Sequence, residues 1–190
     1  LGWVDPKSFM QRNNELMAAY SRGELAMEDY MAFSLEPLIG RTPEEVAHLV
    51  EPWVEDYIEP IIFSDATRTI AAHRKAGDRI LVISASGTHL VKPIAERLGI
   101  DEVLGIELEV AHGFYTGHTV GTLTYREGKI TRLLEWLDEQ EENLEGASFY
   151  SDSRNDLPLL LKVDHPHVVN PDPVLREQAE KAGWPIHHWK

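Results

Sequence analysis

The chain of 190 residues contains no cysteine. This absence excludes disulfide bonds, thiolate metal ligands and a cysteine nucleophile, and it fits a reducing cytoplasm, where we expect the protein to reside. No apolar run approaches the roughly 20 residues that a membrane-spanning helix needs. A basic segment followed by an apolar one, as in a secretory leader, is not visible either. We therefore expect no membrane partner.

Positive charge is also scarce. Lysine and arginine number 18 against 32 aspartates and glutamates, which gives a formal net charge of −14 at pH 7. An acidic surface repels the phosphates of nucleic acids, so a nucleic-acid partner is disfavoured. A small anionic substrate would need a local positive site, made by a metal ion, a lysine or a helix N-terminus.

Residues 1–60 carry helical patterns and no strand-like alternation. A first helix is predicted to begin at Asp5 as the N-cap, with Pro6 at its first position. A second helical stretch spans about 26–38. The segment TPEE at 42–45 has the order of a capping box and predicts the start of a third helix.

Residues 61–190 alternate between apolar, β-branched runs and amphipathic segments. The expected strands are RILVISAS (79–86), GIELEV (105–110), ASFYSDS (147–153) and HVVN (167–170), with one or two hairpins within 113–128. The expected helices are 87–99, 129–142, about 155–162, 171–183 and one that ends near Gly77. This alternation predicts an α/β fold, a Rossmann-like parallel sheet with helices on both faces.

Polar residues follow two of the predicted strands. Ser84, Ala85 and Ser86 come after one, and the segment 152–156 comes after another, while Lys129 begins the helix that follows the hairpin region. Ligands of parallel sheets bind beyond the carboxyl ends of the strands. We expect these three clusters to meet at one edge of the sheet.

These side chains suit a phosphate and a metal ion. Asp152 is a hard oxygen ligand, and Asp156 could bind the same ion, bind it through water, or hold Lys129. Carboxylates and waters suit Mg²⁺, which also accepts phosphate oxygens. Ser84 offers a hydroxyl before a helix N-terminus, whose amides point at an anion, and Lys129 offers a point charge. Such groups meet the electrostatic needs of phosphoryl transfer.

Four segments carry a resemblance to a known family: ILVISAS, GKITRLLEWL, FYSDSRNDLPLL and VVNPDPVLREQAEKAGWPI. Together they resemble the haloacid dehalogenase superfamily of phosphohydrolases, most of all its phosphoserine-phosphatase-like subclass IB. The last segment is typical of the branch that includes histidinol-phosphate phosphatases. The resemblance covers about 61–190, implies the Rossmann-like core there, and implies a helical cap of the C1 type over 1–60.

The resemblance also implies a function. It implies a Mg²⁺-dependent phosphomonoester phosphatase that acts on a small phosphorylated metabolite, of which histidinol phosphate and phosphoserine are the candidates. Ser84 and the Ala85 amide would bind the transferred phosphoryl group, and Lys129 would neutralise its charge and orient the nucleophile. Arg12 and Asn13 match a cap position that would face the substrate.

The fourth motif of the family supplies the remaining roles. Asp152 matches its metal ligand, so the resemblance implies that this carboxylate binds Mg²⁺. Asn155 and Asp156 match the polar pair of the same motif. Asn155 would contact the phosphate, and Asp156 would support the water shell of the metal or hold Lys129.

The first motif of the family, Asp-x-Asp-x-Thr/Val, is not found in the chain. Its first aspartate would attack phosphorus, and its second would act as general acid and base. Asp65 stands alone and lies only 19 residues before Ser84, so we interpret it as the N-cap of the helix that ends near Gly77. The chain begins Leu-Gly-Trp rather than with methionine, and we expect the missing strand and motif upstream.

Two other functions fit parts of the sequence. A non-catalytic phosphate-binding or regulatory protein would keep the phosphate site without the nucleophile, and an upstream first motif would decide against it. A metal site of histidines is disfavoured, because neither histidine pair has a third ligand at helical spacing. The histidines concerned are His165, His167, His187 and His188.

The polypeptide of 190 residues is expected to lack phosphatase activity by itself, because no residue in it matches the nucleophile. Release of inorganic phosphate from phosphomonoesters in the presence of Mg²⁺ measures this. A version extended to its native start should be active, and Asp152→Ala should abolish that activity. Turnover by the present polypeptide at an ordinary phosphatase rate would contradict the prediction.

Overall fold

The computed structural model describes residues 3–22, 24 and 26–190. The helices are α1 (Pro6–Arg22), α2 (Met27–Leu35), α3 (Pro43–Trp53), α4 (Ser64–Ala76), α5 (Thr88–Arg97), α6 (Glu127–Glu139), α7 (Leu157–Leu160) and α8 (Pro173–Ala182). Short helical turns are η1 (Glu36–Leu38), η2 (Val54–Ile58), η3 (Glu59–Ile61) and η4 (Arg154–Asp156). The strands are β1 (Leu81–Gly87), β2 (Glu102–Ala111), β3 (Phe114–Val120), β4 (Ser148–Ser151), β5 (His165–Val169) and β6 (Ile186–His187). The predicted α/β class is confirmed.

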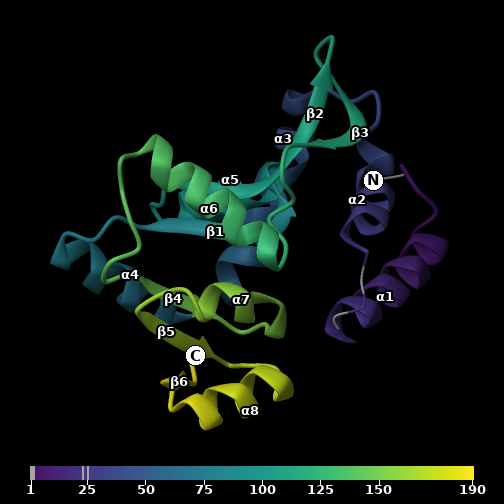
Figure 1. Ribbon diagram of the computed structural model, residues 1–190. Coiled ribbons are helices and arrows are strands. Elements are labelled where there is room, and N and C mark those ends of the chain that lie inside the picture. The colour runs from purple at the N-terminus through teal and green to yellow at the C-terminus, as the bar shows by residue number, and fades with distance from the viewer. Residues whose placement is uncertain (1–2, 23, 25) are drawn as a thin grey trace.

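The N-terminal helices begin where the capping residues predict. The Ser8 N–H donates to the Asp5 carboxylate at 2.9 Å, at the start of α1. Thr42 and Glu45 form a reciprocal capping box at the start of α3, each side chain accepting from the backbone N–H of the other. In Figure 1, α1 and α2 lie beside the α/β part of the chain. Within the described residues, no helix is long and apolar enough to cross a membrane.

The start of α4 differs from the prediction. Asp65 is not its N-cap, because the helix begins at Ser64 and the cap position is Phe63. The Asp65 carboxylate instead accepts from the backbone N–H of Lys190 at 2.8 Å and pairs with Arg68. The aspartate is therefore satisfied by a segment 125 residues away in the chain, which its local spacing does not reveal. The helix ends at Gly77 as predicted.

The strands form two three-stranded sheets rather than one. In the first, β1 pairs with β2 in parallel and β2 pairs with β3 in an antiparallel hairpin. In the second, β4, β5 and β6 are all parallel. Helices α5 and α6 both contact β1 and lie next to it in Figure 1. The region 113–128 contributes one strand, β3, and then a connection to α6.

An apolar cavity of about 540 Å³ lies between the two sheets. Both β1 and β4 line it, and α4 and α6 contribute further side chains. The apolar residues that line it include Ile70, Leu81, Ile83, Leu133, Trp136, Phe149 and Leu159. Because β1 pairs only with β2, and β4 only with β5, each strand has a further edge that takes no strand of the described residues.

The segment from Ser84 to Ser86 lies within β1 rather than after it. Ile83 pairs with Leu104, and the next pair is Gly87 with Ile106, so the register shifts between them. The residues between these pairs leave the regular ladder, as in a β-bulge. The strand predicted over 79–86 is therefore observed as β1, and the helix that follows it begins at Thr88. The placement of Ser84 to Ser86 beyond the end of that strand is wrong.

The 121–129 connection packs closely against the start of α6. A Cβ atom at Gly128 would lie 1.9 Å from the Leu123 carbonyl oxygen. Gly128→Ala therefore requires the backbone to move, and we expect it to lower the free energy of unfolding by about 1–3 kcal/mol. Urea denaturation measures this, with Thr131→Ala at an exposed position of α6 as the control. Equal stability of the two variants would contradict the close approach.

Candidate active site

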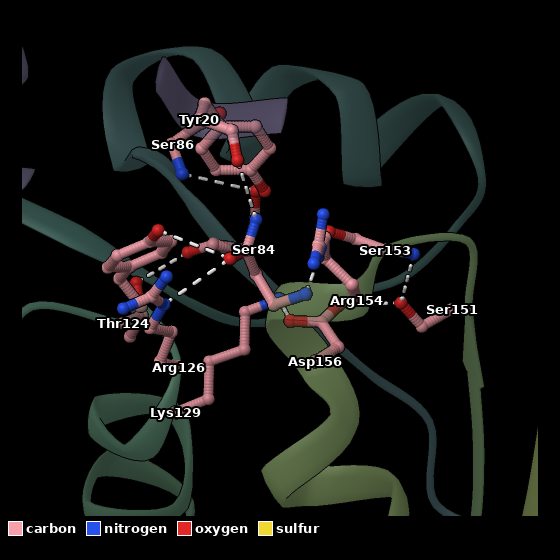
Figure 2. Close-up of polar contacts among 12 residues, drawn as sticks. Tyr20, Ser84, Ser86, Thr124, Arg126, Lys129, Ser151, Ser153, Arg154 and Asp156 are labelled. Atoms are coloured by element: carbon pink, nitrogen blue, oxygen red, sulfur yellow. Dashed lines mark hydrogen bonds and ion pairs between the residues drawn. The ribbon is translucent and has the colours of Figure 1, made fainter. Parts of the chain in front are cut away.

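A buried ion pair lies where α6 meets the segment after β4. Lys129 is in the first turn of α6, and its Nζ lies 2.6 Å from Oδ1 of Asp156. The two side chains are only 7% and 10% exposed. The hydroxyl of Ser151 donates to the other oxygen of Asp156, Oδ2, at 2.7 Å. Figure 2 shows these three side chains converging from two segments of the chain.

Short polar side chains hold the 151–156 segment in shape. The Ser153 hydroxyl accepts from the Asn155 N–H at 3.2 Å, which starts the turn η4. The Ser151 hydroxyl accepts from the Ser153 N–H at 3.1 Å. Local bonds of this kind compete with regular secondary structure and favour turns. They let the chain reverse directly after β4 and bring Asp156 back to Lys129.

Asp152 lies at the end of β4 among other carboxylates. Partial burial raises the pKa of the Asp152 carboxyl group, because the charged form loses part of its hydration. The nearby negative charges of Asp156 and Asp172 raise this pKa further. Asp172 is already engaged, since its carboxylate accepts from the N–H groups of Val174 and Leu175. Among the described residues, no side chain donates to the Asp152 carboxylate, which is accessible to solvent. Such a carboxylate is stabilised by a cation.

Ser84 lies in the irregular part of β1. Its hydroxyl accepts from the Ser86 N–H at 3.2 Å, and its carbonyl oxygen accepts from the buried Thr124 hydroxyl. In Figure 2, Ser84, Lys129 and Asp156 occupy the same part of the view. Ala85, beside Ser84, packs against the apolar cluster that joins β2 to the N-terminal helices. The structure thus places Ser84 near the ion pair through the 124–129 connection.

The side chain of Asn155 makes hydrogen bonds to the connection before α6 and to the end of α1. Its Oδ1 accepts from the Tyr125 hydroxyl at 3.2 Å and from Nε of Arg126 at 3.3 Å. Its Nδ2 donates to the Tyr20 carbonyl oxygen at 3.4 Å, and Arg154 donates to the Ser21 carbonyl oxygen at 3.2 Å. The C-terminal turn of α1 therefore lies against the site. The spacing of residues in the sequence carried no signal for these contacts.

Arg12 and Asn13 lie further back on α1. Arg12 pairs with Glu15 at 3.2 Å on an exposed face. A helix rises 1.5 Å per residue, so these residues lie roughly 10 Å along the axis from Tyr20, which does reach the site. Among the described residues, no hydrogen bond joins Arg12 or Asn13 to the cluster around Lys129. Their predicted contact with a substrate stays a prediction.

The cluster can bind an anion and can contribute to a metal site. It offers the hydroxyl of Ser84, the ammonium of Lys129 and the amide of Asn155 beside the carboxylate of Asp152. The oxygen donors are those that Mg²⁺ prefers. Within the part of the chain that the structure describes, no three histidine, aspartate or glutamate side chains are grouped closely enough to hold a metal ion by themselves.

Sequence comparison places the chain in a family. A profile of the haloacid dehalogenase-like hydrolases matches residues 2–161. The chain belongs to this family, as the segments that carry the resemblance predict. Within it, the chain groups with the phosphoserine-phosphatase-like members, and its class is that of the phosphoric monoester hydrolases.

Named relatives support this class. The chain is 38% identical over 193 aligned positions to a histidinol-phosphatase of Neisseria meningitidis serogroup C, covering all of this chain and 87% of that protein. It is 32% identical over 151 positions to a phosphoserine phosphatase of Mycobacterium tuberculosis, covering 80% of this chain. The alignment spans only 49% of the length of the mycobacterial protein.

Solved structures share the fold. A Bordetella pertussis protein of unknown function matches with a TM-score of 0.89 and 36% identity, covering 97% of this chain and 84% of that one. A phospho-aspartyl intermediate analogue of phosphoserine phosphatase matches with a TM-score of 0.66 and 22% identity, covering 93% and 79% of the two chains. The second likeness concerns the fold alone.

Substitution of either partner of the ion pair, Lys129 or Asp156, should lower the free energy of unfolding. Lys129→Met or Asp156→Leu leaves the other side chain buried without its partner, which costs about 3–5 kcal/mol. The double variant Lys129→Met with Asp156→Leu should recover most of that loss, because no buried charge remains. Urea unfolding at pH 7 measures all three. As a control, Arg132→Ala removes an exposed pair with Glu135 and should cost less than about 1 kcal/mol.

Additive losses in the double variant would contradict this account of the pair. They would mean that Lys129 and Asp156 stabilise the fold through separate contacts rather than through each other.

Proposed function

We propose that this chain forms most of a Mg²⁺-dependent phosphatase that releases phosphate from a small phosphorylated metabolite through an aspartyl-phosphate intermediate. One observation carries the proposal: the buried ammonium of Lys129 lies against Asp156, its charge acts on Asp152, and Ser84 lies in the same part of Figure 2, where β1 and β4 end. A hydroxyl, an ammonium group and a carboxylate in this arrangement suit a phosphate with a metal ion. The named phosphatase relatives support the same class of substrate.

The aspartate that attacks phosphorus belongs, in this proposal, to a strand upstream of residue 1. The apolar cavity between β1 and β4 supports it, because a strand with apolar side chains would occupy that space and pair with both edges. Such a strand runs parallel to its neighbours, and its carboxyl end would then lie between Ser84 and Asp152. A nucleophile there would face a phosphate bound by Ser84 and Lys129.

The chain's own residues bind and orient the substrate. Ser84 would donate its hydroxyl to a phosphate oxygen, with the Ala85 amide beside it, and Lys129 would offset the negative charge on the same group. Asn155 would hold the Tyr125 and Arg126 side chains at the edge of the phosphate site. Residues 1–60 would act as a helical cap that excludes water, and 61–190 as the catalytic core.

The Asp152 carboxylate fits a Mg²⁺ ligand. It carries a raised pKa, lies next to two other carboxylates and takes no side-chain donor among the described residues. Asp156 would not bind the ion directly; it would act on it through a bound water or through Lys129. A bound Mg²⁺ would stabilise the charge on the phosphoryl oxygens. The upstream aspartate would complete the ligand set, so we propose that the present chain binds the ion weakly.

Histidinol phosphate is our first candidate substrate and phosphoserine the second. The C-terminal segment and the identity to the Neisseria histidinol-phosphatase favour the first. Both candidates are small phosphomonoesters with an amino group, so they share the phosphate site and differ in the part that the cap would contact. A panel of phosphorylated metabolites, assayed on the chain extended to its native start, separates them. No release from any member of the panel would overturn the proposal.

Removal of the Asp152 carboxylate should change the melting temperature differently in the presence and in the absence of Mg²⁺. In EDTA at pH 7, Asp152→Asn should raise the melting temperature, because the partly buried, ionised carboxylate beside Asp156 and Asp172 opposes folding. A pKa that is raised in the fold means that ionisation opposes folding above that pKa. The gain should therefore shrink as the pH falls toward 3.

In Mg²⁺, the wild-type chain should melt at a higher temperature than in EDTA, whereas Asp152→Asn should not respond. The exposed change Asp138→Asn, on α6, is the control and should leave the response to Mg²⁺ intact. An equal response of Asp152→Asn and wild type would mean that Asp152 does not bind the ion.

A further inference from the structure

The turn before α6 places an arginine in a backbone conformation that favours glycine. The Gly128 N–H donates to the Tyr125 carbonyl oxygen at 2.9 Å and closes a four-residue turn. Its second residue, Arg126, has φ 50° and ψ −122°. Glycine adopts this region without steric cost, whereas a side chain there strains the backbone. Strained residues that persist in a fold are concentrated at functional sites.

The Arg126 side chain is held in one orientation. Its Nε donates to Oδ1 of Asn155 at 3.3 Å, and its guanidinium carbon lies 5.1 Å from the centre of the Tyr125 ring. These two contacts use one edge and one face of the guanidinium group. In the described part of the chain, its terminal nitrogens have neither a hydrogen bond nor a carboxylate within ion-pair distance. Figure 2 shows the group beside Thr124 and above Lys129.

The charge of the site calls for a further cation. The charge of Lys129 is shared between Asp156, at 2.6 Å, and the phosphate that it would bind, so the ammonium alone offsets only part of the phosphate charge. Asp152 and Asp172 add negative charge close by. A phosphate dianion is therefore bound more tightly if a further positive side chain faces it in addition to the proposed Mg²⁺. A guanidinium with two free nitrogens is well suited to this, because it binds phosphate oxygens through parallel hydrogen bonds.

We propose that Arg126 binds the phosphate group of the substrate, its terminal N–H groups donating to two phosphate oxygens next to Lys129. The inference rests on the proposed function and adds to it a substrate-binding residue. Arg126 immediately precedes α6 and Lys129 is in its first turn, so both cations come from the start of this helix. Asn155 acts on Arg126 as a positioning residue.

Binding of inorganic phosphate to the present chain, measured by titration calorimetry in low salt with Mg²⁺, tests the proposal without requiring turnover. Arg126→Gly should weaken binding at least tenfold while leaving the melting temperature unchanged or higher, because glycine relieves the strain at this φ. Arg126→Lys should weaken binding less, since it keeps a charge but loses the paired donors. Arg132→Gln, on the same helix, should bind phosphate as wild type does.

The outcomes separate this inference from the proposed function. Wild-type affinity in both Arg126 variants would overturn the role of Arg126 and leave the phosphatase proposal standing. A lower melting temperature of Arg126→Gly, with wild-type phosphate affinity in Arg126→Lys, would show a structural role instead. Loss of binding in Arg132→Gln equal to that in Arg126→Gly would show a nonspecific charge effect. Failure of the wild-type chain to bind phosphate would overturn the role of Arg126 in this chain, whereas the phosphatase proposal is tested separately by the metabolite panel on the extended chain.

Discussion

The ion pair between Lys129 and Asp156 is the interaction on which the site depends. Two charges with side chains almost wholly removed from solvent are tolerated only when each compensates the other. The pair joins the first turn of α6 to the segment after β4, so it connects elements that contact different sheets. Ser151 supplies the further hydrogen bond that the carboxylate needs. Hydrogen bonds from Thr124 to Ser84 and from Arg126 to Asn155 join the same parts of the chain beside this pair.

The division of the strands into two sheets is the second constraint. Strands β1 and β4 face a common apolar cavity and have no strand partner there among the described residues. Unpaired strand edges next to apolar side chains are unfavourable in water, because neither the backbone groups nor the side chains are satisfied. The two halves are held together by helices α4 and α6 and, at one end, by the ion pair. The same end carries all the residues that we assign to phosphate and metal binding.

The connection between β3 and α6 shows how backbone strain and function occur together. Gly128 allows the backbone to approach the Leu123 carbonyl oxygen, and Arg126 adopts a conformation that glycine would adopt at no cost. A chain selected for stability alone would place the glycine at the strained position as well. The side chain at 126 reaches Asn155 instead, which in turn contacts the end of α1. The strain is consistent with a role for this side chain in binding.

The sequence by itself determined the α/β class, the helix starts at Asp5 and Thr42, and the candidate set of Ser84, Lys129, Asp152 and Asp156. Capping, hydrophobic periodicity and family motifs are local patterns, so they can be read without knowledge of distant contacts. Tertiary structure alone decided the bulge in β1, the partner of Asp65 and the contacts of Arg126. Each depends on segments far apart in the chain: Arg126 lies 29 residues from Asn155, and Asp65 lies 125 residues from Lys190. A positive φ at a residue other than glycine has no signature in composition or spacing, because the surrounding packing imposes it.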